Sequence, residues 1–169
     1  MNPLGLDLSL TATGIAHSTG TVTIGARVKG AERLVTIRDK VLRWYSCDKA
    51  TLVVVEGYSY ASVNQAHQVG ELGGVVRVAL YERDIPVAVV SPGQRAKYAT
   101  GRGNAKKAEV VSAISARSGL SFADDNQVDA WILRAMALDH YGAPLVQMPK
   151  AHRDVLDKID WPDVDRVAA

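Results

Sequence analysis

Four acidic side chains stand where they could together hold divalent metal ions. Asp7 lies within an alternating apolar segment, on the face opposite its leucines, and Glu56 directly follows the apolar run 52–55. Asp125 and Asp129 are four residues apart at the start of a predicted helix, so they share one of its faces. Carboxylates beside a core stripe need partners or a metal ion. If the four converge, their oxygens suit Mg²⁺ or Mn²⁺, and a pair of such ions can hydrolyse a phosphodiester.

Each acid also has a plain structural interpretation. Asp7 could be an exposed strand residue, although aspartate is disfavoured in strands. Glu56 could be the first solvated residue after a buried strand, although ligands gather at the carboxyl ends of strands in sheets with parallel units. Asp124 is expected to cap the helix that Asp125 begins, with Gln127 completing a capping-box-like pair. The metal site is therefore predicted from the set of acids; no histidine or cysteine cluster favours zinc instead.

The elements that must position these acids begin with three short strands. Apolar residues alternate with polar or small ones at 4–10, and further strand-like runs follow at 15–18 and 22–26. Turn-like segments containing Gly14 and Gly20 separate the three runs. Consecutive strands joined by tight turns favour an antiparallel meander.

Helices and buried strands then alternate along the chain. Apolar residues at 34–45 recur at helical spacing. The apolar run at 52–55 is typical of a strand buried on both faces. The same patterns predict a helix at 63–81, a strand at 86–90, and helices at 105–118 and 125–141. We expect an α/β fold whose mixed sheet joins three antiparallel strands to parallel β-α-β units and is flanked by helices.

Length and composition favour one globular domain. The chain has 169 residues, of which 47% are hydrophobic and 22% charged. We place the domain at 1–142 and an extension, appended or partly flexible, at 143–169, where prolines are frequent and periodicity is weak. No apolar run approaches the roughly 20 residues that span a bilayer, and the N-terminus lacks signal-peptide features. A single cysteine, Cys47, cannot form an intrachain disulfide. We therefore expect a cytoplasmic protein with no membrane partner.

The net charge of +2 is weak, but basic residues are concentrated in one segment. That segment contains no acid between its first and last members, which are Arg95, Lys97, Arg102, Lys106 and Lys107. A cluster of this kind is more often a solvated surface than a binding site.

Five segments, in order along most of the chain, resemble RuvC-like Holliday-junction resolvases of the ribonuclease H-like superfamily. They are similar to the family's first strand and turn, its second acidic motif, its long interface helix, its glycine-containing loop before a DNA-contacting lysine, and the acidic start of its last core helix; the matching residues are 5–16, 53–56, 64–80, 100–107 and 128–131. The resemblance implies a ribonuclease H-like fold, a homodimer, and symmetric nicking of four-way DNA junctions with Mg²⁺ or Mn²⁺, two ions per site.

The resemblance also implies which acids are catalytic and bind the metal. Asp7, Glu56 and Asp129 carry over directly. Bacterial members place their last two aspartates three residues apart, but Asn126 stands three residues before Asp129 here. We therefore assign Asp125 as the fourth ligand, with Asn126 as the alternative. The short, divergent pattern is closer to a phage-borne member than to a chromosomal one, which would place the protein with DNA in a bacterial or phage-infected cytoplasm.

The resemblance further implies contacts with branched DNA. Lys107 matches the family lysine, and the rest of the basic cluster would bind phosphates with little readout of base sequence; these residues are Arg95, Lys97, Arg102 and Lys106.

Two aromatic residues and one helix complete the implied machinery. Tyr58 and Tyr60 lie where family members carry an aromatic wedge that stacks on junction bases, although an ordinary surface or core tyrosine is as good an interpretation. The helix at 63–81 would form the dimer interface, because Gly70 and Gly74 permit close approach of a second helix. The same glycines could instead serve packing on the sheet.

Three other functions remain possible. A related nuclease could act on flaps or RNA–DNA hybrids. Actin-like sugar kinases and ATPases carry an Asp-x-Gly-x-Thr motif similar to residues 7–11, but they repeat the fold twice over a much longer chain. A junction-binding protein without catalytic activity is the third alternative, and the retained acids argue against it.

Overall fold

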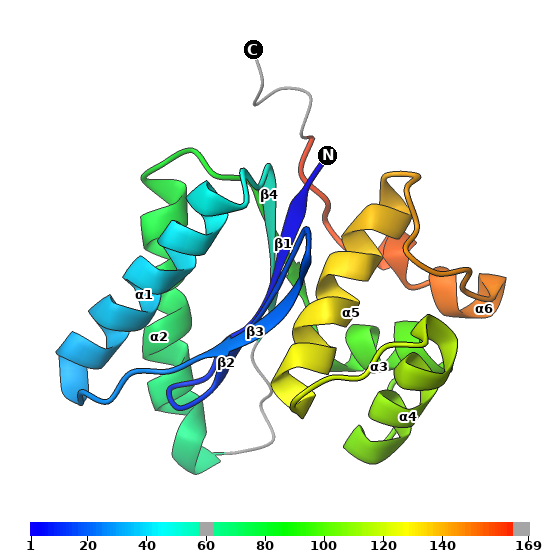
Figure 1. Ribbon diagram of the computed structural model, residues 1–169, viewed down its shortest axis with the longest axis horizontal. Coiled ribbons are helices and arrows are strands. Elements are labelled where there is room, and N and C mark those ends of the chain that lie inside the picture. The colour runs from blue at the N-terminus through cyan, green and yellow to red at the C-terminus, as the bar shows by residue number, and fades with distance from the viewer. Residues whose placement is uncertain (58–62, 164–169) are drawn as a thin grey trace.

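The computed structural model describes residues 1–57 and 63–163, and its strands form one mixed sheet (Figure 1). The strand order is β3-β2-β1-β4-β5. The strands are β1 (Pro3–Asp7), β2 (Thr13–His17), β3 (Gly20–Ile24), β4 (Leu52–Glu56) and β5 (Val87–Val90). Pairs β1–β2 and β2–β3 are antiparallel, and pairs β1–β4 and β4–β5 are parallel. This confirms the predicted α/β fold of an antiparallel meander joined to parallel units.

The parallel register brings two of the predicted acids to adjacent strand ends. Leu6 of β1 pairs with Val55 of β4, so the next positions along these strands are Asp7 and Glu56. Glu56 in turn pairs with Val90, the last residue of β5. Both acids therefore stand at the carboxyl edge of the parallel part of the sheet.

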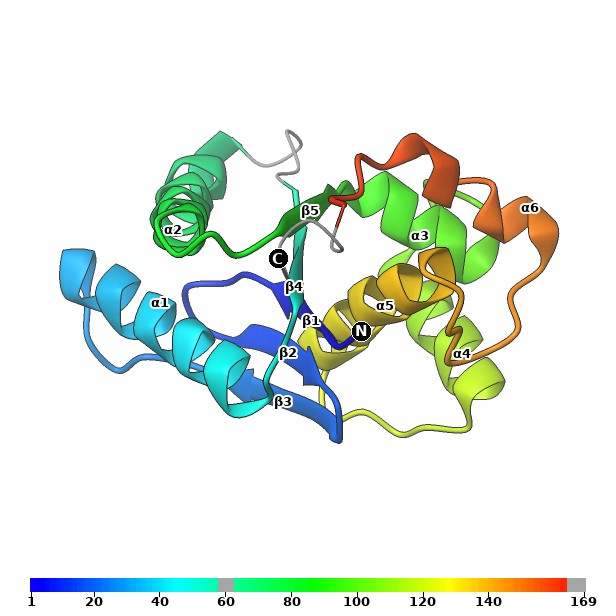
Figure 2. The same ribbon diagram turned by 90° about the horizontal axis from the view of Figure 1, so that it is seen from above.

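Helices cover both faces of the sheet (Figure 2). On one face lie α1 (Gly30–Cys47) and α2 (Val63–Tyr81). On the other lies α5 (Asp125–His140), with α3 (Pro92–Thr100) and α4 (Lys107–Ser118) beside it. The hydrophobic residues consequently form two buried clusters, one in each layer.

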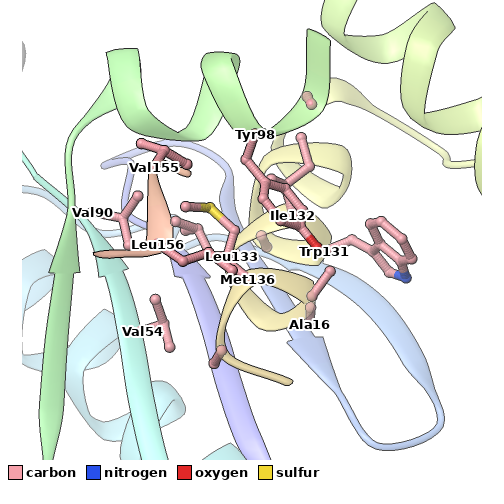
Figure 3. Packing of buried hydrophobic residues seen from close by; sticks show 14 of the residues in the cluster. Ala16, Val54, Val90, Tyr98, Trp131, Ile132, Leu133, Met136, Val155 and Leu156 are labelled. Atoms are coloured by element: carbon pink, nitrogen blue, oxygen red, sulfur yellow. The ribbon is translucent and has the colours of Figure 1, made fainter. Parts of the chain in front are cut away.

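Alternation along the strands decides which face receives each acid. Leu6 and Val55 belong to the cluster beneath α1 and α2. Because successive side chains of a strand point to opposite faces, Asp7 and Glu56 point toward the α5 layer. In that layer, Ile132, Leu133 and Met136 of α5 pack with Val54, Val90 and Tyr98 (Figure 3).

Strand β1 and helix α3 differ from the sequence-based prediction. β1 ends at Asp7, whereas the alternation of leucines extended it to residue 10. Hydrogen bonds between Ser9 and Thr13 form a loop there instead: the Thr13 hydroxyl donates to the Ser9 carbonyl, 2.7 Å away. Helix α3 was not predicted, because its exposed face is basic and its apolar stripe is short. Its signals are local: Ser91 and Gln94 form a capping box, and Gly101 ends the helix in the left-handed region at φ 82°.

The described part of the C-terminal segment packs against the α5 layer. It contains the short helix α6 (Lys150–Arg153) and a 3-10 turn at Leu156–Lys158. Its side chains Met148, Val155, Leu156 and Ile159 are buried in the α5 cluster. The domain boundary placed at residue 142 stays a prediction. Among the described helices, none is long and apolar enough to cross a membrane.

Candidate active site

Three carboxylates from different elements meet at the carboxyl edge of the sheet. They are Asp7 at the end of β1, Glu56 at the end of β4, and Asp129 in the second turn of α5. Each offers one oxygen, and these oxygens all lie within 4.8 Å of one another. Carboxylate oxygens at such spacing can share a divalent ion, which would offset the repulsion between them.

Close approach of α5 to the sheet sets this spacing. A Cβ atom on Gly5 would overlap the backbone oxygen of Ala130, and one on Gly14 would overlap that of Asn126. Only glycine allows the helix backbone to lie so near β1 and β2. Asp129 is therefore held beside the strand that carries Asp7.

Burial and mutual repulsion raise the pKa values of two of the acids. Burial and the negative charges of Glu56 and Asp129 raise the pKa of Asp7 to about 8. Burial also raises the pKa of Asp129, to about 6, although the positive charge of Arg95 acts in the opposite direction. Because the pKa values of Asp7 and Asp129 are raised, these two carboxyl groups are not fully ionised together near neutral pH until a cation compensates their charge.

An arginine occupies the space between two of these acids. Arg95, on the first turn of α3, donates from Nε to Oε1 of Glu56 at 2.6 Å and from Nη1 to Oδ1 of Asp129. Its side chain is only 11% exposed. The sequence predicted Arg95 as a surface phosphate contact; that contact stays a prediction, and the structure gives the guanidinium two acidic partners. The capping box at Ser91 could have indicated that a helix begins there and that Arg95 lies on its first turn.

The fourth predicted ligand lies beside the cluster and is paired with a lysine. Lys107, the first residue of α4, places Nζ 2.6 Å from Oδ2 of Asp125 and 3.8 Å from Oδ2 of Asp129. The hydrogen bond from Lys107 lowers the pKa of Asp125, whose side chain is 45% exposed. Asn126 lines the cleft that contains the three clustered acids. The choice between Asp125 and Asn126 as the fourth ligand therefore stays a prediction.

The three acids open into a cleft of about 620 Å³. Its lining comes from the ends of β1, β4 and β5, from α2, α3, α4 and α5, and from the loop before α4. The residues of chemical interest along it are Asp7, Ser9, Glu56, Arg77, Arg95, Lys107, Asn126 and Asp129. Acids at the base and cations at the side suit a ligand that carries phosphate and binds through metal ions.

Three of the remaining predicted DNA contacts belong to α3 and to the loop that follows it. Arg102 and Lys106 are exposed on the loop between α3 and α4, and Nη2 of Arg102 lies 3.1 Å from Oε1 of Glu109. Lys97 is half-buried on α3. Tyr58 and Tyr60 lie outside the described residues. The DNA-binding roles of all five stay predictions.

Comparison with known proteins supports the family that the motifs suggested. The family model described as "Crossover junction endodeoxyribonuclease RuvC" matches residues 9–140. A crossover junction endodeoxyribonuclease RuvC from Nocardia farcinica is 31% identical over 86% of this chain and 84% of its own length. One from Frankia casuarinae is 31% identical over 83% of this chain and 88% of its own length.

The fold agrees with the same family. The structure of Thermus thermophilus RuvC in complex with a Holliday junction substrate superposes with a TM-score of 0.65 at 23% identity, covering 88% of this chain and 99% of that one. Matching family motifs, curated relatives and fold all point to one conclusion: this chain belongs to the RuvC family of crossover junction endodeoxyribonucleases.

Proposed function

We propose that this protein is a structure-selective endonuclease that nicks four-way DNA junctions by metal-dependent phosphodiester hydrolysis. The observation that carries the proposal is the convergence of Asp7, Glu56 and Asp129 within 4.8 Å at the base of an open cleft. Membership of the RuvC family supports the reaction, and the T. thermophilus relative bound to a Holliday junction supports the substrate. Branched DNA is thus the partner that we propose for the cleft.

The donor set fits Mg²⁺ or Mn²⁺. Every member of the cluster is a carboxylate, and the described part of the chain places no histidine or cysteine among them. Hard oxygen ligands suit these ions, whereas zinc favours nitrogen and sulfur. When bound, a pair of such ions would activate water and stabilise the leaving oxygen. We propose Asp7, Glu56 and Asp129 as ligands, with Asp125 as the fourth.

The residues around the acids would orient the DNA. Lys107 stands at the cleft, half-exposed, and could exchange its bond with Asp125 for a phosphate oxygen. That exchange would release the Asp125 carboxylate toward the metal site at the moment when DNA is bound. Arg102 and Lys106 are exposed nearby and would hold the phosphates of the same strand.

We further propose that two copies of the chain pair through α2. Near the end of this helix, Val78 is 57% exposed and Tyr81 is 83% exposed, and Val35 of α1 is 41% exposed. A Cβ atom on Gly74 would meet nothing within 4 Å, so another helix could approach its backbone there. A two-fold pair would present two active sites to the two symmetry-related strands of a junction. Its working location would be the cytoplasm, where such DNA lies.

A substrate panel tests the proposed activity. Purified protein is incubated with end-labelled four-way junction, flap, linear duplex and RNA–DNA hybrid, each with Mg²⁺, Mn²⁺ or EDTA. We expect metal-dependent paired nicks in the four-way junction and little cutting of the linear duplex. Preferential cutting of the flap or the hybrid would instead favour the related nuclease functions. Junction binding without cutting under every metal condition would contradict catalysis.

A further inference from the structure

Arg95 has the position and partners of a bound cation. Its guanidinium bridges Glu56 and Asp129, through Nε at 2.6 Å from Glu56 Oε1 and through Nη1 to Asp129 Oδ1. All three side chains are largely shielded from water, with exposures of 11% for Arg95, 14% for Glu56 and 3% for Asp129. Ion pairs in such surroundings are screened far less than surface pairs. The arginine therefore contributes to the charge balance of the site itself.

The charges of the three acids and of the cations that pair with acids beside them balance with a single divalent ion. Asp7, Glu56 and Asp129 sum to −3 when ionised, and Arg95 reduces this to −2. Asp125 and Lys107 form their own pair and cancel. One Mg²⁺ or Mn²⁺ would neutralise the remainder, whereas two ions would leave an excess of two positive charges in a partly buried site. Excess charge of either sign is costly where water is scarce.

The backbone that carries Arg95 is fixed at both ends. The capping box of Ser91 and Gln94 with Pro92 starts α3, and Gly101 terminates it. Ala96, Tyr98 and Ala99 anchor the helix in the core. A guanidinium offers several donors in a rigid plane, so it can contact two carboxylates at once, which a lysine cannot do with the same geometry. Arg95 is therefore placed to hold this position before any metal ion arrives.

We infer that Arg95 occupies one of the two cation positions in the DNA-free protein. The protein alone then binds a single divalent ion tightly, with Asp7 and the remaining oxygens of the other two acids. A second ion binds only in competition with the guanidinium. This inference rests on the proposed metal site, and it assigns to Arg95 a role in setting the number of bound ions.

Removing the positive charge should reveal the second position. In Arg95→Gln, we expect the second ion to bind at least about tenfold more tightly than in the wild type. This is a modest part of the repulsion that Coulomb's law gives between a unit positive charge and a dication a few ångströms away. Arg95→Lys keeps the charge and should retain a single tight ion. Arg38→Gln removes a partly exposed arginine of α1 that pairs with its neighbour Asp39, so it is the matched control.

Counting bound ions tests the inference without any cleavage assay. DNA-free protein is titrated with Mn²⁺, and electron paramagnetic resonance measures the free ion, while circular dichroism verifies the fold of each variant. The expected result is one tight Mn²⁺ per chain for wild type, Arg95→Lys and Arg38→Gln, and two for Arg95→Gln. If Arg95→Gln does not fold, Arg95→Met, which also removes the positive charge, takes its place with the same expected count of two.

The possible failures are distinguishable. Two equally tight ions in the wild type would overturn the role of Arg95 while leaving the metal site intact. A single ion in folded Arg95→Gln would do the same. No bound Mn²⁺ in the wild type would overturn the proposed metal site and this inference with it.

Discussion

Asp7→Asn should make the metal-free protein more stable while removing its activity. Asp7 is crowded by Glu56 and Asp129, and burial with this repulsion raises its pKa from 3.8 to about 8. A raised carboxyl pKa means that folding favours the protonated form. The favourable contribution of this carboxyl group to the stability of the fold is therefore complete below the pKa that it has in the unfolded chain. It is lost as the pH rises toward the raised pKa that it has in the folded protein. Asparagine is neutral at every pH and has nearly the same shape, so it escapes this loss.

The expected gain follows from the size of the shift. A shift of about four pKa units corresponds to about 6 kcal/mol as an upper bound, at about 1.4 kcal/mol per unit. Local relaxation and lost hydrogen bonds reduce this, so we expect Asp7→Asn to raise the free energy of unfolding by about 1–3 kcal/mol near neutral pH. In a chain of 169 residues, this corresponds to a rise of about 3–9 °C in Tm.

Thermal and urea unfolding in EDTA would measure this effect. The gain should be small at about pH 5 and increase toward about pH 7.5, because the wild-type penalty develops over that range. Added Mg²⁺ or Mn²⁺ should stabilise the wild type more than Asp7→Asn. The control is Asp39→Asn, which alters an exposed aspartate of α1 whose side chain is 58% exposed. A variant that is less stable than wild type in EDTA, or a gain that does not change with pH, would refute the argument.

Three further predictions concern DNA contact, the fourth ligand and assembly. Lys107→Ala should weaken junction binding at all sequences alike and flatten the dependence of log affinity on log salt by about one unit. If neither the salt slope nor the cleavage changes, Lys107 is an ordinary solvated surface residue. Asp125→Asn should greatly reduce cleavage and raise the Mg²⁺ requirement, whereas Asn126→Ala should have a modest effect. Asp124→Asn should have the least effect, because asparagine also caps helices. If Asn126→Ala is inactive and Asp125→Asn is nearly normal, Asn126 and not Asp125 is the fourth ligand. Tyr81→Glu should shift a dimer to monomer in sedimentation velocity, and a wild type that is monomeric at micromolar concentration yet makes paired nicks would contradict the α2 interface.

The fold was largely predictable because its strands are patterned simply. The run at 52–55 is buried on both faces, and the alternation around Asp7 shows which residues face the same layer. Once the strands are ordered, parallel pairing places Asp7 and Glu56 side by side. Asp129 follows because helical spacing aligns it with the apolar stripe of α5. These three positions therefore depend on local pattern and one rule of sheet topology.

The rest of the site depends on contacts between distant segments. Arg95 and Asp129 are far apart in sequence and meet only because α3 turns back over the end of β4. Lys107 finds Asp125 through the packing of α4 beside α5. Neither pairing leaves a periodic signal in the sequence. The basic segment that contains Arg95 and Lys107 therefore predicted only solvated residues or phosphate contacts, and not ion pairs with the acids of the site. Likewise, the burial of Leu156 beneath α5 follows from a tertiary contact that weak periodicity cannot reveal.

The most direct test of the proposed function is to separate cutting from binding at Glu56. Wild type and Glu56→Gln are compared on a labelled four-way junction, with cleavage measured in Mg²⁺ or Mn²⁺ and binding measured by gel shift. We predict that Glu56→Gln binds the junction normally and does not cut it, because the metal cluster loses one of its three carboxylates. Cleavage retained within about tenfold of wild type would correspond to a loss of less than about 1.4 kcal/mol in transition-state stabilisation and would contradict the metal site.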